Sequence, residues 1–208
     1  MKYVLVFTRK QIEDNHNLFN ERRNFYKVKG LDFLKSREFI LEKAGPLQGN
    51  ILDIGSGKGI MALMLVEAGY RFISIDNDEK VLEIAALNLA HKNLLSKAEL
   101  HVMDVYSLKF KENSFDNIFI VEALHHMHDI SGVFAEVDRV LSPGGKLILA
   151  DFNKKGMDIV DLVHRHEGRK HKTSCIGREE AESWLGRKGY SIKRYEDKCH
   201  WILIAEKI

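Results

Sequence analysis

A glycine-rich loop, Asp53-Ile54-Gly55-Ser56-Gly57-Lys58-Gly59, is the stretch of the chain whose residue types and spacing most clearly point to chemistry. It lies where an apolar run is expected to pass from a strand into a helix. Glycines at alternate positions free the backbone for a tight turn, and small residues let a ligand approach the main chain. The helix that follows offers unpaired N–H groups at its positive end. The loop predicts a nucleotide-like ligand, and the alternative is a glycine turn that binds nothing.

The spacing of the glycines separates the ligand classes. A dinucleotide loop has the pattern GxGxxG, whereas the third glycine of this loop comes one position early. Asp53 precedes the loop, and its carboxylate would repel a diphosphate. A P-loop is excluded because no Gly-Lys-Ser/Thr closes the run at the required distance. A ligand with an adenosine-like part and an amino group remains.

Two further carboxylates follow the next two expected strands. Asp76 comes 19 positions after Gly57, where a carboxylate can accept both hydroxyls of a ribose. Asp104 is placed to accept the exocyclic amine of adenine while Met103 packs on the ring. Each aspartate alone is more often a helix cap or turn residue. Their joint placement with Asp53 at three successive strand ends favours a binding site, because ligands of open parallel sheets bind at that edge.

These residues need a sheet to position them, and the pattern of the chain predicts one. Short apolar runs alternate with longer amphipathic ones, which is typical of strand-helix repeats that build a mostly parallel sheet. Strands are expected at 50–54, 71–75, 99–103, 116–121 and 146–151, and helices at 60–68, 79–91, 131–141 and 178–188. The runs 190–196 and 200–206 are too close for a crossover helix, so we expect an antiparallel hairpin at one sheet edge. The fold class is therefore α/β, Rossmann-like and doubly wound.

The first 48 residues are expected to form a cap on the main body, residues 49–208, within one compact domain. The run MKYVLVFTRK is interpreted as a strand, being too short for a secretory leader. Residues 11–45 have helical spacing and end at Ala44-Gly45-Pro46, as a helix should.

The composition indicates a soluble, globular, cytoplasmic protein. The 208 residues are 45% hydrophobic and 30% charged, which excludes disorder for most of the chain. A net charge of +2 gives no field that would gather polyanions, so no nucleic acid is expected. No stretch approaches the roughly 18 apolar residues that span a bilayer. Cys175 and Cys199 fit reduced thiols better than a disulfide or a metal site.

Five motifs in order resemble those of class I S-adenosylmethionine-dependent methyltransferases, in particular the small-molecule branch related to quinone-biosynthesis enzymes. They are DIGSGKG, SIDND, HVMDV, FDNIFIVEALHHMHD and EVDRVLSPGGKLILAD, and they cover residues 49–152. The resemblance implies S-adenosylmethionine as cofactor, S-adenosylhomocysteine as product, and a seven-stranded sheet whose last two strands form a reversed hairpin. It also implies the cofactor contacts: Asp53 near the methionine amino group, Gly55, Ser56, Gly57 and Gly59 against the cofactor, Asp76 with Asn77 at the ribose, and Met103, Asp104 and Val105 at adenine.

Methyl transfer from a sulfonium needs alignment and, for some acceptors, removal of a proton. The candidates for a general base are His126 and then His125, in the segment after the fourth expected strand. The alternative is that both histidines are structural. A metal site is not expected, because adjacent histidines cannot easily face one ion. Glu122 is expected to contact the methionine end of the cofactor or to shape the acceptor pocket.

Two other segments each have a functional interpretation and a purely structural one. The stretch 164–172 carries four permanent positive charges and one negative charge, so it is either a solvated loop or the part that recognises an anionic acceptor. Cys175 follows it and is either a pocket thiol or an ordinary half-buried one. Tyr26 either reaches the methionine carboxylate or packs with the other aromatic residues of its helix.

The sequence thus predicts an enzyme, monomer or homodimer, that methylates a small molecule. Motifs for methylating nucleobases are absent, since the fourth strand ends in Val-Glu-Ala-Leu. Two rival hypotheses are kept: a protein that binds the cofactor and acts through a partner, and a nicotinamide oxidoreductase, which the glycine spacing disfavours.

Overall fold

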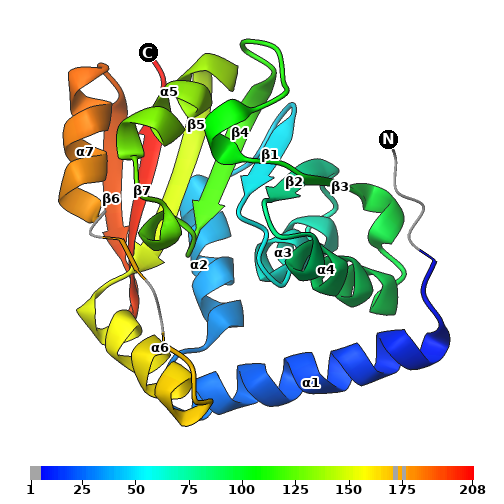
Figure 1. Cartoon of the computed structure of the whole chain (residues 1–208). Helices are drawn as coiled ribbons and strands as arrows, with labels where there is room; N and C mark the ends of the chain where they lie inside the picture. The colour runs from blue at the N-terminus through cyan, green and yellow to red at the C-terminus, as the bar shows by residue number, and fades with distance from the viewer. Residues whose placement is uncertain (1–5, 171–172, 175–176) are drawn as a thin grey trace.

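A seven-stranded sheet forms the centre of the computed structural model, which describes residues 6–170, 173–174 and 177–208 (Figure 1). The strand order is β3-β2-β1-β4-β5-β7-β6. Their bounds are β1 Ile51–Ile54, β2 Phe72–Asp76, β3 Ala98–Val102, β4 Phe115–Val121, β5 Leu141–Phe152, β6 Ser191–Glu196 and β7 His200–Glu206. The first five strands are parallel, which confirms the expected Rossmann-like α/β fold.

Seven helices surround this sheet in the described part of the chain. They are α1 Arg9–Val28, α2 Phe33–Ala44, α3 Ile60–Glu67, α4 Glu79–His91, α5 Ile130–Val140, α6 Lys154–His166 and α7 Arg178–Arg187. Single 3₁₀ turns lie at Leu95–Lys97, Val105–Ser107 and Leu124–His126. None of the described helices combines the length and the apolar composition needed to cross a bilayer.

The central strand β4 shows how the core is divided. Ile118 and Ile120 belong to the apolar cluster under α5 and α7, whereas Phe119 and Val121 belong to the cluster under α2 and α3. Successive side chains of a strand point to opposite faces, so an almost continuous apolar run is what a strand covered on both faces requires. This explains why the expected central strands are found within one to two residues of their predicted ends, apart from the start of β5.

The C-terminal strands confirm the expected antiparallel hairpin at one edge of the sheet. The two runs are joined by a short turn; β6 is the edge strand, and β7 lies between β5 and β6, antiparallel to both. Only β7 is reversed, because β6 is antiparallel to β7 and so points the same way as β5. Strand β7, apolar from Trp201 to Ala205, is buried between its neighbours, while the polar β6 takes the edge.

Two boundaries differ from the sequence prediction. Strand β5 starts at Leu141, five residues early, because Leu141 already pairs with Phe115 before an irregularity in the register. The expected N-terminal strand falls largely on residues 1–5, outside the described residues. Residues 6–8 are not in a strand, and Arg9 and Lys10 begin α1, where Thr8 and Gln11 form a capping box.

The helical lead-in consists of two helices, α1 and α2, separated by a bend at 29–32. In Figure 1, α1 runs across one end of the molecule and spans from α6 to α4. The carboxyl ends of the parallel strands face this end, so α1 covers the edge at which the predicted site lies.

Candidate functional site

The glycine loop connects β1 to α3 and is fastened to the end of β2. The N–H groups of Gly55 and Ser56 donate to the Ile75 carbonyl at 2.8 and 3.1 Å, and that of Gly57 donates to Asp76 Oδ2 at 2.9 Å. Gly55 has a φ of +76°, and a Cβ at this position would lie 2.5 Å from the Cβ of Ala123. A side chain there would be both strained and blocked, which explains the need for glycine.

A cavity of about 410 Å³, here called the strand-end cavity, opens at the carboxyl ends of β1 to β4. It brings together nine of the fourteen site residues that the sequence predicts: Gly55, Gly57, Asp76, Asn77, Met103, Asp104, Val105, Glu122 and His126. Ile75, Val81, Tyr106 and Met127 add to its walls. The cavity therefore combines carboxylates, backbone and an apolar surface.

Asp76 and Asp104 line this cavity while they also cap local backbone. Asp76 accepts hydrogen bonds from the N–H groups of Gly57 and Asp78, the latter at 3.1 Å to Oδ1. Asp104 Oδ1 accepts from the Tyr106 N–H at 3.0 Å and so begins a 3₁₀ turn. Capping and ligand binding are compatible, because a carboxylate has about four acceptor sites and these bonds occupy only some of them.

Asp53 lies elsewhere than expected. Its side chain is 1% exposed and accepts a hydrogen bond from Ser74 Oγ at 2.7 Å, and Ser74 Oγ lies 2.6 Å from Ser56 Oγ. Burial raises the pKa of Asp53 to about 6, although the Ser74 hydrogen bond and Arg37 oppose this rise. Asp53 does not line the strand-end cavity, and it supports the glycine loop through the hydrogen bonds that connect it with Ser74 and Ser56.

Gly59, the residue before α3, also lies outside the strand-end cavity and packs on α4. A Cβ there would lie 2.9 Å from the Cβ of Ala85. The absence of a side chain on Gly59 allows α3 and α4 to pack closely against each other.

The two candidate bases differ in position. His126 is exposed and lines the strand-end cavity. His125 is buried: its Nδ1 lies 2.6 Å from Asp151 Oδ1, and its N–H donates to Asp151 Oδ2 at 2.9 Å. The rings of His125 and His126 lie 4.0 Å apart between centroids. Asp151 therefore fixes the buried His125, whereas the exposed His126 is accessible to a ligand in the strand-end cavity.

A second, smaller cavity of about 180 Å³, here called the loop cavity, lies on the other side of the glycine loop, between α1, α2 and α3. Tyr26 and Ser56 line it, and so do four cationic residues, Arg22, Arg23, Arg37 and Lys58. Tyr26 is buried, its pKa is raised by that burial, and its hydroxyl lies 3.5 Å from Arg22 Nη2. Gly55, Gly57 and Glu122 line both this cavity and the strand-end cavity.

Glu122, at the boundary of the two cavities, is part of a buried chain of charges. It adopts a left-handed conformation with a φ of 55° and pairs with the guanidinium of Arg37. His200 bridges it to Asp197, with 2.7 Å from Nε2 to Glu122 Oε1 and 3.0 Å from Nδ1 to Asp197 Oδ1. Burial opposes the charged form of Glu122, but Arg37 and His200 outweigh burial and lower its pKa to about 2. Burial likewise opposes the charged form of His200, but Asp197 and Glu122 raise its pKa.

Sequence reasoning missed Arg37, Tyr106 and His200. Arg37 carried a signal, because it falls on the same helical face as the apolar Phe33, Ile40 and Ala44, where an arginine needs a buried partner. His200 begins an apolar strand and shows no such signal.

The basic segment is only partly described. His164 and His166 lie in the last turn of α6, Glu167 ends that helix, and residues 171–172 and 175–176, including Cys175, lie outside the described residues. Cys199 is buried, with a free thiol. Within the described ranges, no group of three or more His, Cys, Asp or Glu residues is placed to hold a metal ion.

The strand-end cavity suits a nucleoside with a polar tail better than a diphosphate. Its acceptors are the carboxylates of Asp76 and Asp104, and apolar side chains lie between them. A Cβ on Gly57 would approach nothing closer than 3.9 Å, so the loop backbone is open to a ligand. Hydroxyls and an exocyclic amine match these acceptors, whereas phosphates would be repelled.

Comparison with known proteins agrees with this geometry. Residues 52–149 match the methyltransferase domain family. The chain is 32% identical to the ubiquinone/menaquinone biosynthesis C-methyltransferase of Rickettsia typhi over 72% of this chain and 60% of that protein. It is 33% identical to the sterol 24-C-methyltransferase of Pneumocystis carinii over 78% of this chain and 45% of that protein. The chain thus spans about half of the length of these relatives.

Solved structures share the fold. An S-adenosylmethionine-dependent methyltransferase from Aquifex aeolicus aligns with a TM-score of 0.66 and 19% identity, covering 90% of this chain and 98% of that one. Phosphoethanolamine N-methyltransferase 2 of Haemonchus contortus, solved with S-adenosyl-L-methionine, aligns with a TM-score of 0.66 and 19% identity, covering 83% of this chain and 52% of that one.

Proposed function

We propose that this chain, whose residues 52–149 match the methyltransferase domain family, is a class I S-adenosylmethionine-dependent methyltransferase that transfers a methyl group from S-adenosylmethionine to a small-molecule acceptor. The observation that carries the proposal is the strand-end cavity, in which Asp76, Met103 and Asp104 meet beside the open backbone of the glycine loop.

The residues of this cavity fit the cofactor. Asp76 would accept hydrogen bonds from the ribose hydroxyls, with Asn77 beside it. Met103 and Val105 would pack on adenine, and Asp104 would accept its amine. Glu122 lies towards the loop cavity, where a cationic group would be favoured by its charge. Tyr26 and the loop cavity would enclose the methionine end.

When bound, S-adenosylmethionine supplies a methyl group on a positively charged sulfur that is open to in-line displacement. The residues of the chain then have to align the acceptor and exclude water. His126 would remove a proton from an acceptor that is not already a free nucleophile, and its exposed position at the cavity wall supports this role. His125, fixed by Asp151, would hold His126 and the turn at 124–126 in position.

An anionic acceptor is part of the proposal. Arg22, Arg23 and Lys58 line the loop cavity next to the glycine loop, and cations at a binding site favour an acid group. The expected cytoplasmic location and the monomeric or homodimeric state stay predictions from the sequence.

The test is transfer itself. The purified protein would be incubated with S-adenosylmethionine that carries a labelled methyl group and with a panel of acceptors, in which each aromatic or aliphatic acid is paired with its uncharged amide. We expect labelled product and an equal amount of S-adenosylhomocysteine, with acids preferred over amides. Tight binding of S-adenosylhomocysteine without single-turnover transfer to any acceptor would instead favour a protein that binds the cofactor and acts through a partner.

A further inference from the structure

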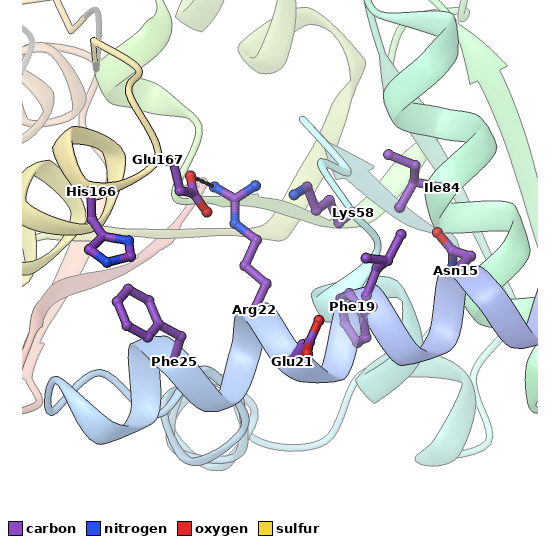
Figure 2. Close-up of a pocket in the computed structure, with 10 residues that line it drawn as sticks. Asn15, Phe19, Glu21, Arg22, Phe25, Lys58, Ile84, His166 and Glu167 are labelled. Atoms are coloured by element: carbon purple, nitrogen blue, oxygen red, sulfur yellow. Dashed lines mark hydrogen bonds and ion pairs between the residues drawn. The ribbon is translucent and has the colours of Figure 1, made fainter.

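A third cavity of about 530 Å³, here called the α1 cavity, lies along α1 between α4 and the end of α6 (Figure 2). It shares Phe19, Arg22 and Lys58 with the loop cavity. A molecule in the α1 cavity would therefore extend towards the glycine loop. None of the fourteen site residues that the sequence predicts lines it.

Most of its wall is apolar. Leu18, Phe19 and Phe25 come from α1, and Ile84 faces them from α4. Leu18 is 67% exposed, and in Figure 2 the ring of Phe25 faces that of His166, with 5.0 Å between ring centroids. Apolar side chains left open to water at a cavity favour an apolar ligand.

Two cations converge at one side of this cavity. In Figure 2 the amine of Lys58 points towards the guanidinium of Arg22. Within the described residues, no carboxylate lies within ion-pair distance of Lys58. Burial lowers the pKa of Lys58 to about 8, and the positive charges of Arg22 and Arg169 lower it further, while Glu167 opposes them. Two like charges that point at each other create a place where an anion is stabilised.

A carboxylate of the protein already stands at this place. Glu167, just past the end of α6, pairs with Arg22 at 3.1 Å and also with Arg169. Both partners of the Arg22–Glu167 pair are about one quarter exposed, so the pair is weak and easily exchanged. Glu167 neutralises Arg22, whereas Lys58 has no ion pair with any of the described residues.

From this arrangement we infer that the α1 cavity binds the methyl acceptor, that the acceptor is an organic acid with an apolar chain or ring, and that Glu167 holds the place of its acid group until it arrives. This inference rests on the proposed function, because the bound acid is a methyl acceptor only if the protein is a methyltransferase. The acid group would lie between Arg22 and Lys58, displacing Glu167, and the apolar part would lie along Leu18, Phe25 and Ile84.

The test is a calorimetric titration with decanoate, a simple acid of this class, and with decan-1-ol as its uncharged counterpart. It would be run with and without saturating S-adenosylhomocysteine. We expect one equivalent of decanoate to bind and decan-1-ol to bind about tenfold more weakly, because one charge-assisted contact of about 1.4 kcal/mol corresponds to a factor of ten.

Variants separate the parts of the site. Glu167→Gln removes the competing carboxylate and is expected to tighten decanoate binding severalfold, whereas Lys58→Gln is expected to weaken it about tenfold. Lys10 is an exposed cation of α1 outside the cavity, and Lys10→Gln should change the affinity for decanoate less than twofold.

Proton uptake is a readout that a purely structural role would not change. At pH 8 about half of the Lys58 amines are charged, and a bound carboxylate favours the charged form. Titrations in buffers of different ionisation enthalpy should show uptake of up to about half a proton per decanoate in the wild type and none in Lys58→Gln.

Three results would overturn the inference: no saturable decanoate binding to the wild type and Glu167→Gln, equal affinity for decan-1-ol, or weaker decanoate binding in Glu167→Gln. Failure of the proposed function gives a different pattern, in which decanoate binds but S-adenosylhomocysteine does not.

Discussion

At the scale of single residues, Asp76 and Glu122 are both held in place before any ligand binds. Asp76 is fixed by the Gly57 and Asp78 N–H groups, and Glu122 by Arg37 and His200. A carboxylate that is already ordered loses less conformational freedom when it binds a ligand. Both side chains are therefore expected to affect affinity strongly.

Replacement of Asp76 with alanine should weaken binding of S-adenosylhomocysteine by about 1.5 to 3 kcal/mol, because charge-assisted hydrogen bonds to the ribose are lost. Calorimetric titration measures this change. The affinity of Asp76→Asn for S-adenosylhomocysteine should lie between those of the wild type and Asp76→Ala, since an amide oxygen still accepts one hydrogen bond. Glu83→Ala, on the exposed side of α4, is the matched control and should leave the affinity unchanged. An unaltered dissociation constant for Asp76→Ala would contradict its assigned role.

The buried charge chain predicts a pH dependence of stability. Because Asp197 and Glu122 raise the pKa of His200 above its usual 6.5, the stability that its proton contributes is complete below that value and is lost as the pH rises through the folded pKa. Glu122 has the opposite sign: its pKa is lowered from 4.5 to about 2, so its contribution is present above 4.5 and is lost as the pH falls towards 2.

Denaturant unfolding at pH 6.5 and 8 measures the His200 contribution. We expect the free energy of unfolding of the wild type to fall between these pH values by more than that of His200→Gln, in which no imidazole titrates. His101→Gln, at a half-buried position on β3, controls for loss of a histidine elsewhere. The same pH dependence in wild type and His200→Gln would show that His200 is not charged in the folded protein.

At the scale of elements, close contact between α3 and α4 depends on one glycine. Gly59 has a φ of +79°, and an added Cβ would lie 3.0 Å from the Cα of Ala85. Gly59→Ala should therefore destabilise the protein by about 1 to 3 kcal/mol, through the left-handed backbone and the forced separation of the two helices. Gly186, in α7, has open space around its Cα, so Gly186→Ala should stabilise by about 0.5 to 1 kcal/mol. Equilibrium unfolding of both variants measures the effects, and equal effects would contradict this account of the loop.

The order of strands and helices was predictable because each buried strand is a short apolar run bounded by a loop. The bounds of α4 were predicted to the residue, since Asp78 caps its first turn. The insertion of β7 between β5 and β6 was not predictable from local pattern, because strand order depends on pairing between residues about fifty positions apart. For the same reason, the pairing of Arg37 with Glu122, which are 85 positions apart, could only be seen in three dimensions.

At the scale of the whole molecule, α1 joins parts of the chain that are distant in sequence. Asn15 donates to Asn88 of α4 at 2.8 Å, and Asn88 in turn donates to the Lys58 carbonyl of the glycine loop at 2.8 Å. At its other end α1 contacts α6 through Arg22 and Glu167. The α1 and loop cavities both lie under this helix, so their shape depends on its position.

Ligand binding in the loop cavity should therefore stabilise α1. We expect hydrogen exchange of the amides of residues 9–28 to slow severalfold when S-adenosylhomocysteine is added, because Tyr26 gains a partner. Amides of α7, on the opposite face of the sheet, provide the internal control and should exchange at the same rate. Slowing confined to residues 55–59 would mean that α1 takes no part in binding.

Calorimetric titration of the wild-type protein with S-adenosylhomocysteine decides whether the strand-end cavity holds an adenosine-type sulfonium cofactor. We expect saturable binding of one equivalent, with reduced nicotinamide dinucleotide failing to compete. Absence of saturable binding, or displacement of S-adenosylhomocysteine by the dinucleotide, would contradict this assignment.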